Sequence, residues 1–243
     1  MPETLVLLHG FGGTHRAWDG VIERLDPERY RPLALDLPGH GARAAHPPPI
    51  GFDACVRTVL ADAPERFALC GYSLGGRVAL HVALAAPERV SRLCVISANP
   101  GLEDPGERAR RLAEDERLAQ RLESEPYEEW IEGWRTQAVF AQEPASAGEL
   151  ARADHRRNDP RALAAAMRGL SLGNMQSLWG RLAELRMPVV LLAGERDRKF
   201  LALAERALPL LADGSLAVLA GGHGLVLENP AGVAGALDPR AGS

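Results

Sequence analysis

Residues 67–83 read FALCGYSLGGRVALHVA and decide how the chain folds. A strand-like apolar run, Phe67–Cys70, leads into Gly71-Tyr72-Ser73-Leu74-Gly75, and a helical pattern follows directly. A G-x-S-x-G motif between a strand and a helix is typical of a nucleophile elbow, in which a sharp turn exposes the serine hydroxyl and glycines make room for a strained backbone. The motif alone also fits a glycine-rich structural turn. Its setting favours the elbow, and we predict a catalytic role for Ser73.

The rest of the chain alternates short β-branched or leucine-rich runs with longer helical patterns. This alternation predicts an α/β fold with a mostly parallel sheet flanked by helices. Ligands of such sheets bind beyond the carboxyl ends of the strands, where most of the runs end in turn-forming residues. The expected strands are Leu5–Leu8, Pro32–Leu35, Phe67–Cys70, Leu93–Ser97, Val189–Ala193 and Leu216–Leu219.

A long middle segment has no strand pattern. From about Gly101 to Arg186 the sequence is helical, charged and rich in alanine and leucine. Because this segment leaves and rejoins the sheet at strand carboxyl ends, we expect it to cover the site as a lid. The predicted organisation is a core of residues 1–100 and 186–243 with a helical lid at 101–185. A separate helical domain beside the sheet is the alternative.

Composition and termini exclude several classes of function. The 28 basic and 32 acidic residues give a net charge of −4, which favours neither nucleic acid nor an anionic membrane surface as a partner. The apolar run at Val78–Ala86 is far shorter than the roughly 20 residues of a membrane span. Met1–Thr4 leads straight into a strand pattern without the features of a signal peptide. Cys55, Cys70 and Cys94 lack the spacing of a zinc site or redox pair, so we expect a cytoplasmic protein with reduced cysteines and no metal.

A serine hydroxyl becomes reactive only when a histidine takes its proton and a carboxylate fixes that histidine. Asp197 follows the fifth expected strand, and His223 lies between glycines after the last one. Asp36 and Asp213 compete with Asp197, but Asp36 precedes the serine and Asp213 belongs to an ordinary Asp-Gly turn. We therefore predict that Ser73, Asp197 and His223 act together as catalytic residues.

The order Ser, Asp, His, with each residue after a strand, resembles the α/β-hydrolase family. The run His9-Gly10-Phe11-Gly12-Gly13 resembles the oxyanion loop of that family. This resemblance implies that the backbone N–H groups of Phe11 and Leu74 stabilise an oxyanion. We expect His9 and the turn Pro38–Gly41 to be structural.

A narrower resemblance extends over essentially the whole chain. It rests on the stretches GYSLGGRVA at 71–79, NPGL at 99–102, ERARR at 107–111, Trp134 with VFA at 139–141, SLW at 177–179 and GERDRKF at 194–200. In these stretches the chain is similar to the 2-succinyl-6-hydroxy-2,4-cyclohexadiene-1-carboxylate synthases of menaquinone biosynthesis. The resemblance implies a lyase that eliminates pyruvate from a cyclohexene tricarboxylate without a cofactor, with Ser73 as the base after activation by His223.

A tricarboxylate substrate requires several fixed cations, preferably arginines with their bidentate fork. Arg77 lies four residues after Ser73, one helical turn along the same face. Arg111 matches a lid arginine of the family, and Tyr72 and Trp134 match positions that line its pocket. We therefore expect these four residues to bind a small anionic substrate.

The chain departs from the family pattern at two places. Where the family has an arginine three residues before an asparagine, this chain has His155 before Asn158, so the third cation is misplaced or substituted. Where the family reads Gly-Thr-Gly-x-Gln-Pro-Ser-Leu-Trp, residues 171–179 read SLGNMQSLW, with Met175-Gln176 in the altered part. A shifted substrate preference would fit both changes.

Two other functions fit the same residues. The triad can hydrolyse a carboxylic ester or thioester through an acyl-enzyme on Ser73, if an ester-like electrophile rather than an acidic C–H bond meets the serine. The second alternative is a non-enzymatic receptor that reuses the fold and its pocket. The complete triad argues against this alternative.

Overall fold

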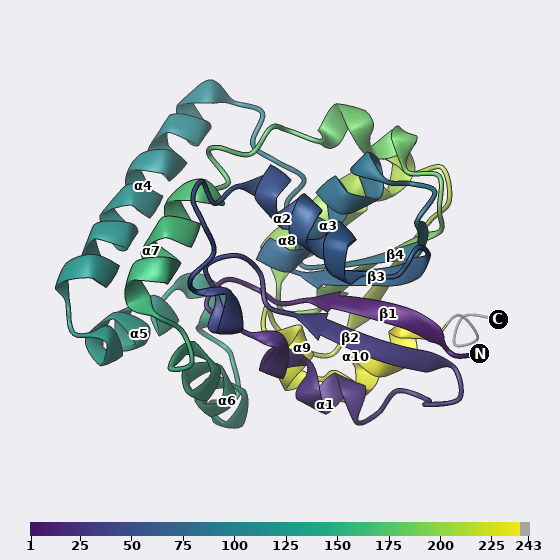
Figure 1. The fold of residues 1–243 in the computed structure, drawn as a ribbon, viewed down its shortest axis with the longest axis horizontal. Coiled ribbons are helices and arrows are strands. Elements are labelled where there is room, and N and C mark those ends of the chain that lie inside the picture. Colours follow the sequence, from purple (N-terminus) through teal and green to yellow (C-terminus); the bar gives the residue numbers. More distant parts are fainter. Residues whose placement is uncertain (239–243) are drawn as a thin grey trace.

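The structure is a computed structural model that describes residues 1–238, and a six-stranded sheet forms its centre (Figure 1). All strand pairings are parallel, in the order β2-β1-β3-β4-β5-β6. The six expected strands are confirmed, but β4 ends before Ser97, whose φ of +46° lies outside the strand region. The strands are β1 (Glu3–Leu8), β2 (Tyr30–Leu35), β3 (Phe67–Tyr72), β4 (Val90–Ile96), β5 (Val189–Gly194) and β6 (Gly214–Leu219).

Helices cover both faces of the sheet (Figure 1). One face carries α2 (Phe52–Asp62), α3 (Leu74–Ala85) and α8 (Arg198–Ala207). The other face carries α1 (Asp19–Ile22), α9 (Leu225–Glu228) and α10 (Pro230–Leu237). Short 3-10 helices lie at His15–Trp18, Gly41–Arg43 and Leu208–Leu210.

Alternate strand residues face two separate cores. In β1, Leu5 and Leu7 pack with α1, α9 and α10, whereas Val6 and Leu8 pack on the side of α2 and α3. This two-residue period, with apolar residues at every position, is that of a parallel sheet buried on both faces. The leucine-rich runs of the sequence therefore become strands because both of their faces are covered.

The chain between β4 and β5 forms α helices and, throughout this fully described segment, no strand. These helices, here called the lid, lie beyond the carboxyl ends of the strands (Figure 1). They have a small core of their own that contains Trp130, Ile131 and Leu163. The division at residues 100 and 186 stays a prediction. The lid contains α4 (Pro105–Ser124), α5 (Tyr127–Arg135), α6 (Ala145–His155) and α7 (Pro160–Gly169), with 3-10 helices at Ala138–Phe140 and Trp179–Glu184.

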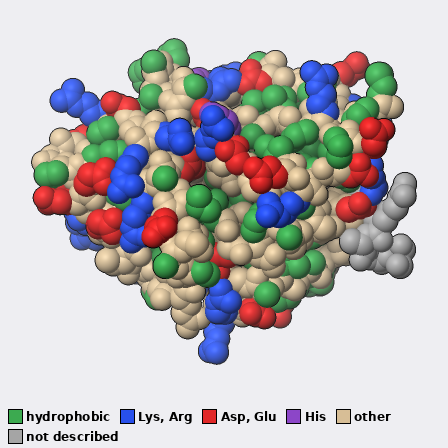
Figure 2. Space-filling view, turned by 90° about the horizontal axis from the view of Figure 1, so that it is seen from below, with side chains coloured by type: hydrophobic (Ala, Val, Ile, Leu, Met, Phe, Trp, Pro, Cys, Tyr) green, Lys and Arg blue, Asp and Glu red, His purple; other side chains and the backbone are tan. Residues whose placement is uncertain are grey.

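The surface carries charges of both signs. Figure 2 shows Lys and Arg side chains interspersed with Asp and Glu side chains over the face that it draws. Within residues 1–238, no helix has the length and apolar character needed to cross a membrane. Cys55, Cys70 and Cys94 are free thiols and are buried, as the sequence predicts.

Candidate active site

Ser73 occupies the turn between β3 and α3 in a backbone conformation that few non-glycine residues adopt. Its φ is +53° and its ψ is −108°. Glycines on both sides make this turn possible. A Cβ atom at Gly71 would lie 2.2 Å from the carbonyl oxygen of Gly75, and a Cβ atom at Gly75 would lie 2.2 Å from that of Leu8. The turn thus has the strained geometry of an elbow and holds Ser73 against the end of β1.

Three side chains from separate elements form a hydrogen-bonded chain. The Nε2 atom of His223 lies 3.2 Å from Ser73 Oγ, and its Nδ1 atom lies 2.9 Å from Asp197 Oδ2. Because the carboxylate accepts from Nδ1–H, Nε2 is free to take the serine proton. Of the competing acids, Asp36 instead accepts from the backbone N–H groups of His15 and Ala42, and Asp213 lies at the amino end of β6. The geometry supports Asp197, and its catalytic role stays a prediction.

Aromatic rings surround His223. The ring centroids of Phe200, Tyr72 and Phe140 lie 4.5, 5.5 and 6.1 Å from that of His223. Burial raises the pKa of the Tyr72 hydroxyl, so this group stays protonated and is able to donate a hydrogen bond. Rings around the histidine exclude water, which strengthens electrostatic interactions there.

The loop after β1 lies against the elbow. A Cβ atom at Gly10 would lie 2.8 Å from the Tyr72 ring and 3.5 Å from the Cβ atom of Ser73. In the described part of the chain, neither the Phe11 N–H nor the Leu74 N–H has a hydrogen-bond acceptor. Backbone donors without an acceptor beside a reactive serine are what an oxyanion requires. Their role as an oxyanion hole stays a prediction.

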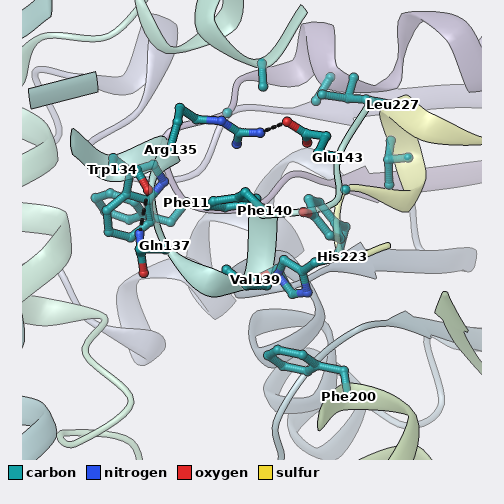
Figure 3. Close-up of a pocket in the computed structure, with 18 of the residues that line it drawn as sticks. Phe11, Trp134, Arg135, Gln137, Val139, Phe140, Glu143, Phe200, His223 and Leu227 are labelled. Atoms are coloured by element: carbon teal, nitrogen blue, oxygen red, sulfur yellow. Dashed lines mark hydrogen bonds and ion pairs between the residues drawn. The ribbon is translucent and has the colours of Figure 1, made fainter. Parts of the chain in front are cut away.

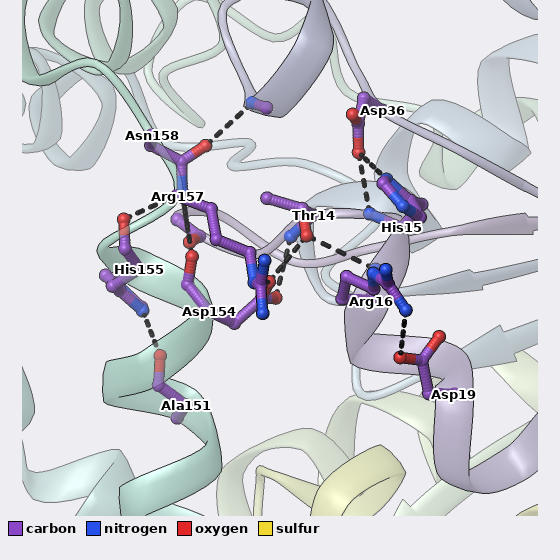
Figure 4. A network of polar contacts seen from close by, with 12 residues as sticks. Thr14, His15, Arg16, Asp19, Asp36, Ala151, Asp154, His155, Arg157 and Asn158 are labelled. Carbon is purple, nitrogen blue, oxygen red and sulfur yellow. Dashed lines mark hydrogen bonds and ion pairs between the residues drawn. The ribbon is translucent and has the colours of Figure 1, made fainter.

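Lid residues hold the loop that carries Phe11 (Figure 4). The carboxylate of Asp154 accepts from the Thr14 N–H at 2.8 Å and from the Thr14 hydroxyl at 2.5 Å. The side-chain amide of Asn158 donates to the carbonyl oxygen of Gly12 at 2.8 Å. Asp154 and Asn158 are both buried. The position of the loop therefore depends on the lid.

A cavity of about 220 Å³ lies between the lid and the carboxyl ends of the strands (Figure 3). Two predicted residues do not line it: Leu74, which is predicted to act through its backbone, and Asp197, which lies behind His223. The other predicted site residues come together in its wall, from the core and from the lid. They are Phe11, Tyr72, Ser73, Arg77, Arg111, Trp134 and His223.

Arg77 reaches this cavity from α3. Its Nη1 atom donates to the carbonyl oxygen of Leu170 at 2.9 Å, and within residues 1–238 it has no ion pair with a carboxylate. Burial, together with the nearby charge of Arg111, lowers the pKa of Arg77 to about 9. A bound carboxylate would favour the charged form of Arg77 again. The binding of an anionic ligand by Arg77 stays a prediction.

His155 does not supply the third cation. Its Nδ1–H donates to the carbonyl oxygen of Ala151 at 2.9 Å, and burial lowers its pKa to about 4, so the ring is uncharged at neutral pH. The structure instead brings Arg135 and Lys199 to the cavity. Sequence reasoning assigned neither residue. The position of Lys199, two residues after Asp197, was an available signal, and so was that of Arg135, directly after Trp134, although the charge pattern of its helix does not separate it from the solvated charges of the lid.

Comparisons with known proteins agree with this fold. The profile of the alpha/beta hydrolase family matches residues 5–236. A relative from Salmonella newport (strain SL254), named 2-succinyl-6-hydroxy-2,4-cyclohexadiene-1-carboxylate synthase, is 37% identical over 238 residues, which cover 96% of this chain and 92% of the relative. The structure of MenH from S. aureus superimposes with a TM-score of 0.87 and 28% identity over 96% of this chain and 90% of that chain. A hydrolase from Pseudomonas aeruginosa PA01 superimposes with a TM-score of 0.81 and 25% identity over 100% and 91% of the two chains. With its elbow, its parallel sheet and these relatives, the chain belongs to the alpha/beta hydrolase family.

Proposed function

We propose that this chain is a lyase that eliminates pyruvate from 2-succinyl-5-enolpyruvyl-6-hydroxy-3-cyclohexene-1-carboxylate. The product is 2-succinyl-6-hydroxy-2,4-cyclohexadiene-1-carboxylate, an intermediate of menaquinone biosynthesis. The observation that carries the proposal is that arginines from the core and the lid share one cavity with Ser73 and His223. The name of the Salmonella relative, which contains this product, supports it.

In the proposed reaction, His223 accepts the hydroxyl proton of Ser73 while Ser73 Oγ removes the ring proton at C2. The electron pair of the broken C–H bond forms the C2–C3 double bond, the ring double bond moves from C3–C4 to C4–C5, and the bond from C5 to the enolpyruvyl oxygen breaks. The leaving enolate takes up a proton and becomes pyruvate. Asp197 keeps His223 in the required tautomer and stabilises its charged form.

The oxyanion loop has a place in this reaction. The proton at C2 lies next to the succinyl ketone, so its removal puts negative charge on the ketone oxygen. Backbone donors already in position stabilise such developing charge more than water does, because they need no reorganisation. The N–H groups of Phe11 and Leu74, which have no other acceptor in residues 1–238, support this role.

Arg77 and Arg111 are proposed to bind two of the three substrate carboxylates. A hydrogen bond between charged groups contributes about 1.5 to 3 kcal/mol when it is partly shielded from water. An esterase for neutral acyl chains has no use for such charges. The cations of the cavity therefore favour the lyase over the hydrolase that shares its triad.

The proposed reaction requires a small anionic substrate, and it uses no cofactor. We also propose that it takes place in the cytoplasm. The three free cysteines support this location, because free thiols persist in reducing compartments.

The test is pyruvate release from the proposed substrate, followed with lactate dehydrogenase and compared with hydrolysis of p-nitrophenyl acetate. The expected result is pyruvate release that the Ser73→Ala variant lacks, with slow or no ester hydrolysis. Rapid ester hydrolysis without pyruvate release would instead establish the acyl-enzyme reaction.

A further inference from the structure

Arg135 and Glu143 form an ion pair in the wall of the cavity (Figure 3). Arg135 is the last residue of α5, and Glu143 lies in the loop that leads to α6. The Nη2 atom of Arg135 donates to Glu143 Oε2. Both side chains are only 6% exposed. The pair is therefore largely removed from water but borders the space that a substrate would fill.

Such a pair does not need to be there for stability. The desolvation of two charges offsets most of their attraction, whereas the loss of one partner leaves the other charge buried and uncompensated. Arg135 therefore requires an anion in this position. Any carboxylate of suitable geometry meets that requirement, whether it belongs to the protein or to a ligand.

The pair differs from the other lid ion pair at the site. Arg111 binds Asp115 through Nε alone, at 2.9 Å from each carboxylate oxygen. In the described structure Asp115 does not line the cavity, so it leaves the terminal nitrogens of Arg111 available to a ligand. Glu143 lines the cavity and occupies a terminal nitrogen of Arg135. Glu143 thus holds the position that a substrate carboxylate would take on Arg135.

The pair also lies close to the proposed catalytic histidine. The guanidinium carbon of Arg135 lies 3.9 Å from the centre of the Phe140 ring, and this ring lies 6.1 Å from that of His223. The next residue, Gly224, leaves space for Glu143, since a Cβ atom there would lie 2.6 Å from Glu143 Oε1. A carboxylate on Arg135 would therefore be one aromatic ring away from His223.

We propose that Arg135 binds the third carboxylate of the substrate and that Glu143 occupies this subsite until the ligand replaces it. The proposal rests on the proposed function, and it gives Arg135 the task that the uncharged His155 cannot perform. Lys199 also lines the cavity, but it is exposed, and solvent and salt weaken its attraction for an anion. Arg135 thereby selects ligands with three carboxylates over ligands with two.

Two matched probes test the subsite without turnover. Propane-1,2,3-tricarboxylate and glutarate differ by one carboxylate on the same three-carbon chain. Their affinities are measured by titration calorimetry with the wild type, Arg135→Gln and Glu143→Gln. Arg156→Gln is the control, because Arg156 forms an exposed ion pair with Glu128 on the same lid.

The proposal predicts opposite effects for the two members of the pair. Arg135→Gln weakens binding of the tricarboxylate by about 10-fold or more and leaves glutarate within about 2-fold, as expected for the loss of one charge-assisted bond. Glu143→Gln strengthens tricarboxylate binding by about 3-fold or more, because the competing carboxylate is gone. Arg156→Gln changes neither affinity.

Other outcomes overturn the subsite. If Arg135→Gln weakens both probes equally, or if Glu143→Gln weakens tricarboxylate binding as Arg135→Gln does, the pair is a structural bridge. Melting temperatures show whether the Arg135→Gln protein folds. If it does not, the tricarboxylate affinity of Glu143→Gln alone decides whether the subsite exists. Failure of the proposed function is seen separately, as wild-type protein that binds the tricarboxylate through Arg135 but releases no pyruvate.

Discussion

Asp115 binds Arg111 from outside the cavity and through a single nitrogen atom. Asp115 lies one helical turn after Arg111 in α4, and both of its carboxylate oxygens are 2.9 Å from Arg111 Nε. This contact fixes the plane of the guanidinium and leaves the two terminal nitrogens for a substrate carboxylate. If Arg111 binds a substrate carboxylate, as proposed, Asp115 is a positioning residue that acts on substrate binding without reaching the substrate.

Replacing Asp115 with asparagine should raise KM for the tricarboxylate substrate by about 3 to 10-fold and change kcat less than about 2-fold, because a charge-assisted contact that orients Arg111 is lost. Steady-state kinetics of pyruvate release measure both constants. Glu125→Gln is the matched control, since it removes the partner of Arg121 in an exposed pair of the same spacing at the end of the same helix. A fall in kcat at unchanged KM would contradict the positioning role.

The triad residues should act as one unit. Ser73→Ala, His223→Ala and Asp197→Ala should each lower kcat by about 10² to 10⁴-fold, with combined losses far smaller than the product of the single losses. The reason is that the serine requires the histidine and the histidine requires its carboxylate. Circular dichroism checks that each variant folds. Full activity in Asp197→Ala would show that another acid serves His223.

Substrate binding should weaken in alkaline solution. Arg77 attracts a carboxylate only while it is protonated, and burial lowers its pKa to about 9. KM should therefore be constant below this pH and rise by about 10-fold between pH 8 and pH 10 as the charged fraction falls. The Arg77→Ala variant should show a high KM at every pH without this rise. A rise of the same size in Arg77→Ala would assign it to a different group.

The lid should influence the chemical step through the oxyanion loop. Asp154→Ala leaves the Thr14 N–H and hydroxyl without their acceptor. This loss should lower the free energy of unfolding by about 1 to 3 kcal/mol and loosen the loop that carries Phe11. We expect kcat to fall by about 10-fold or more with little change in KM. Asp159→Ala is the control, because Asp159 caps α7 by accepting from the Ala162 N–H and does not contact the loop. Equal kinetic effects of the two variants would contradict the role of Asp154.

Features that depend on local sequence could be predicted without a structure. The strands could be predicted from short apolar runs that end at glycine or proline, as at β3. The elbow follows from the spacing of Gly71 and Gly75, where any side chain would collide with neighbouring backbone. The order of Ser73, Asp197 and His223 along the chain places each after a different strand, so the sheet topology brings them together.

Features that depend on burial could not be predicted. Arg135 ends α5, whose other charged residues are Glu128, Glu129 and Glu132, and charged residues on a helix usually face solvent. Its partner Glu143 follows eight residues later, a spacing without a helical signature. The uncharged state of His155 arises from burial under the lid, and no local pattern encodes that burial. The cation proposed to bind the third carboxylate is therefore visible only after the lid has folded over the sheet.

In the proposed function, the cations of the cavity direct an alpha/beta hydrolase triad towards a tricarboxylate. The most direct test of this role is kcat/KM of Arg77→Ala and Arg111→Ala for the anionic cyclohexene substrate and, in parallel, for a neutral p-nitrophenyl ester. Each variant should lose about 10 to 100-fold on the anionic substrate and change less than about 2-fold on the ester, because only the former uses the charge. Equal losses on both substrates would show that the arginines are structural and do not select a tricarboxylate.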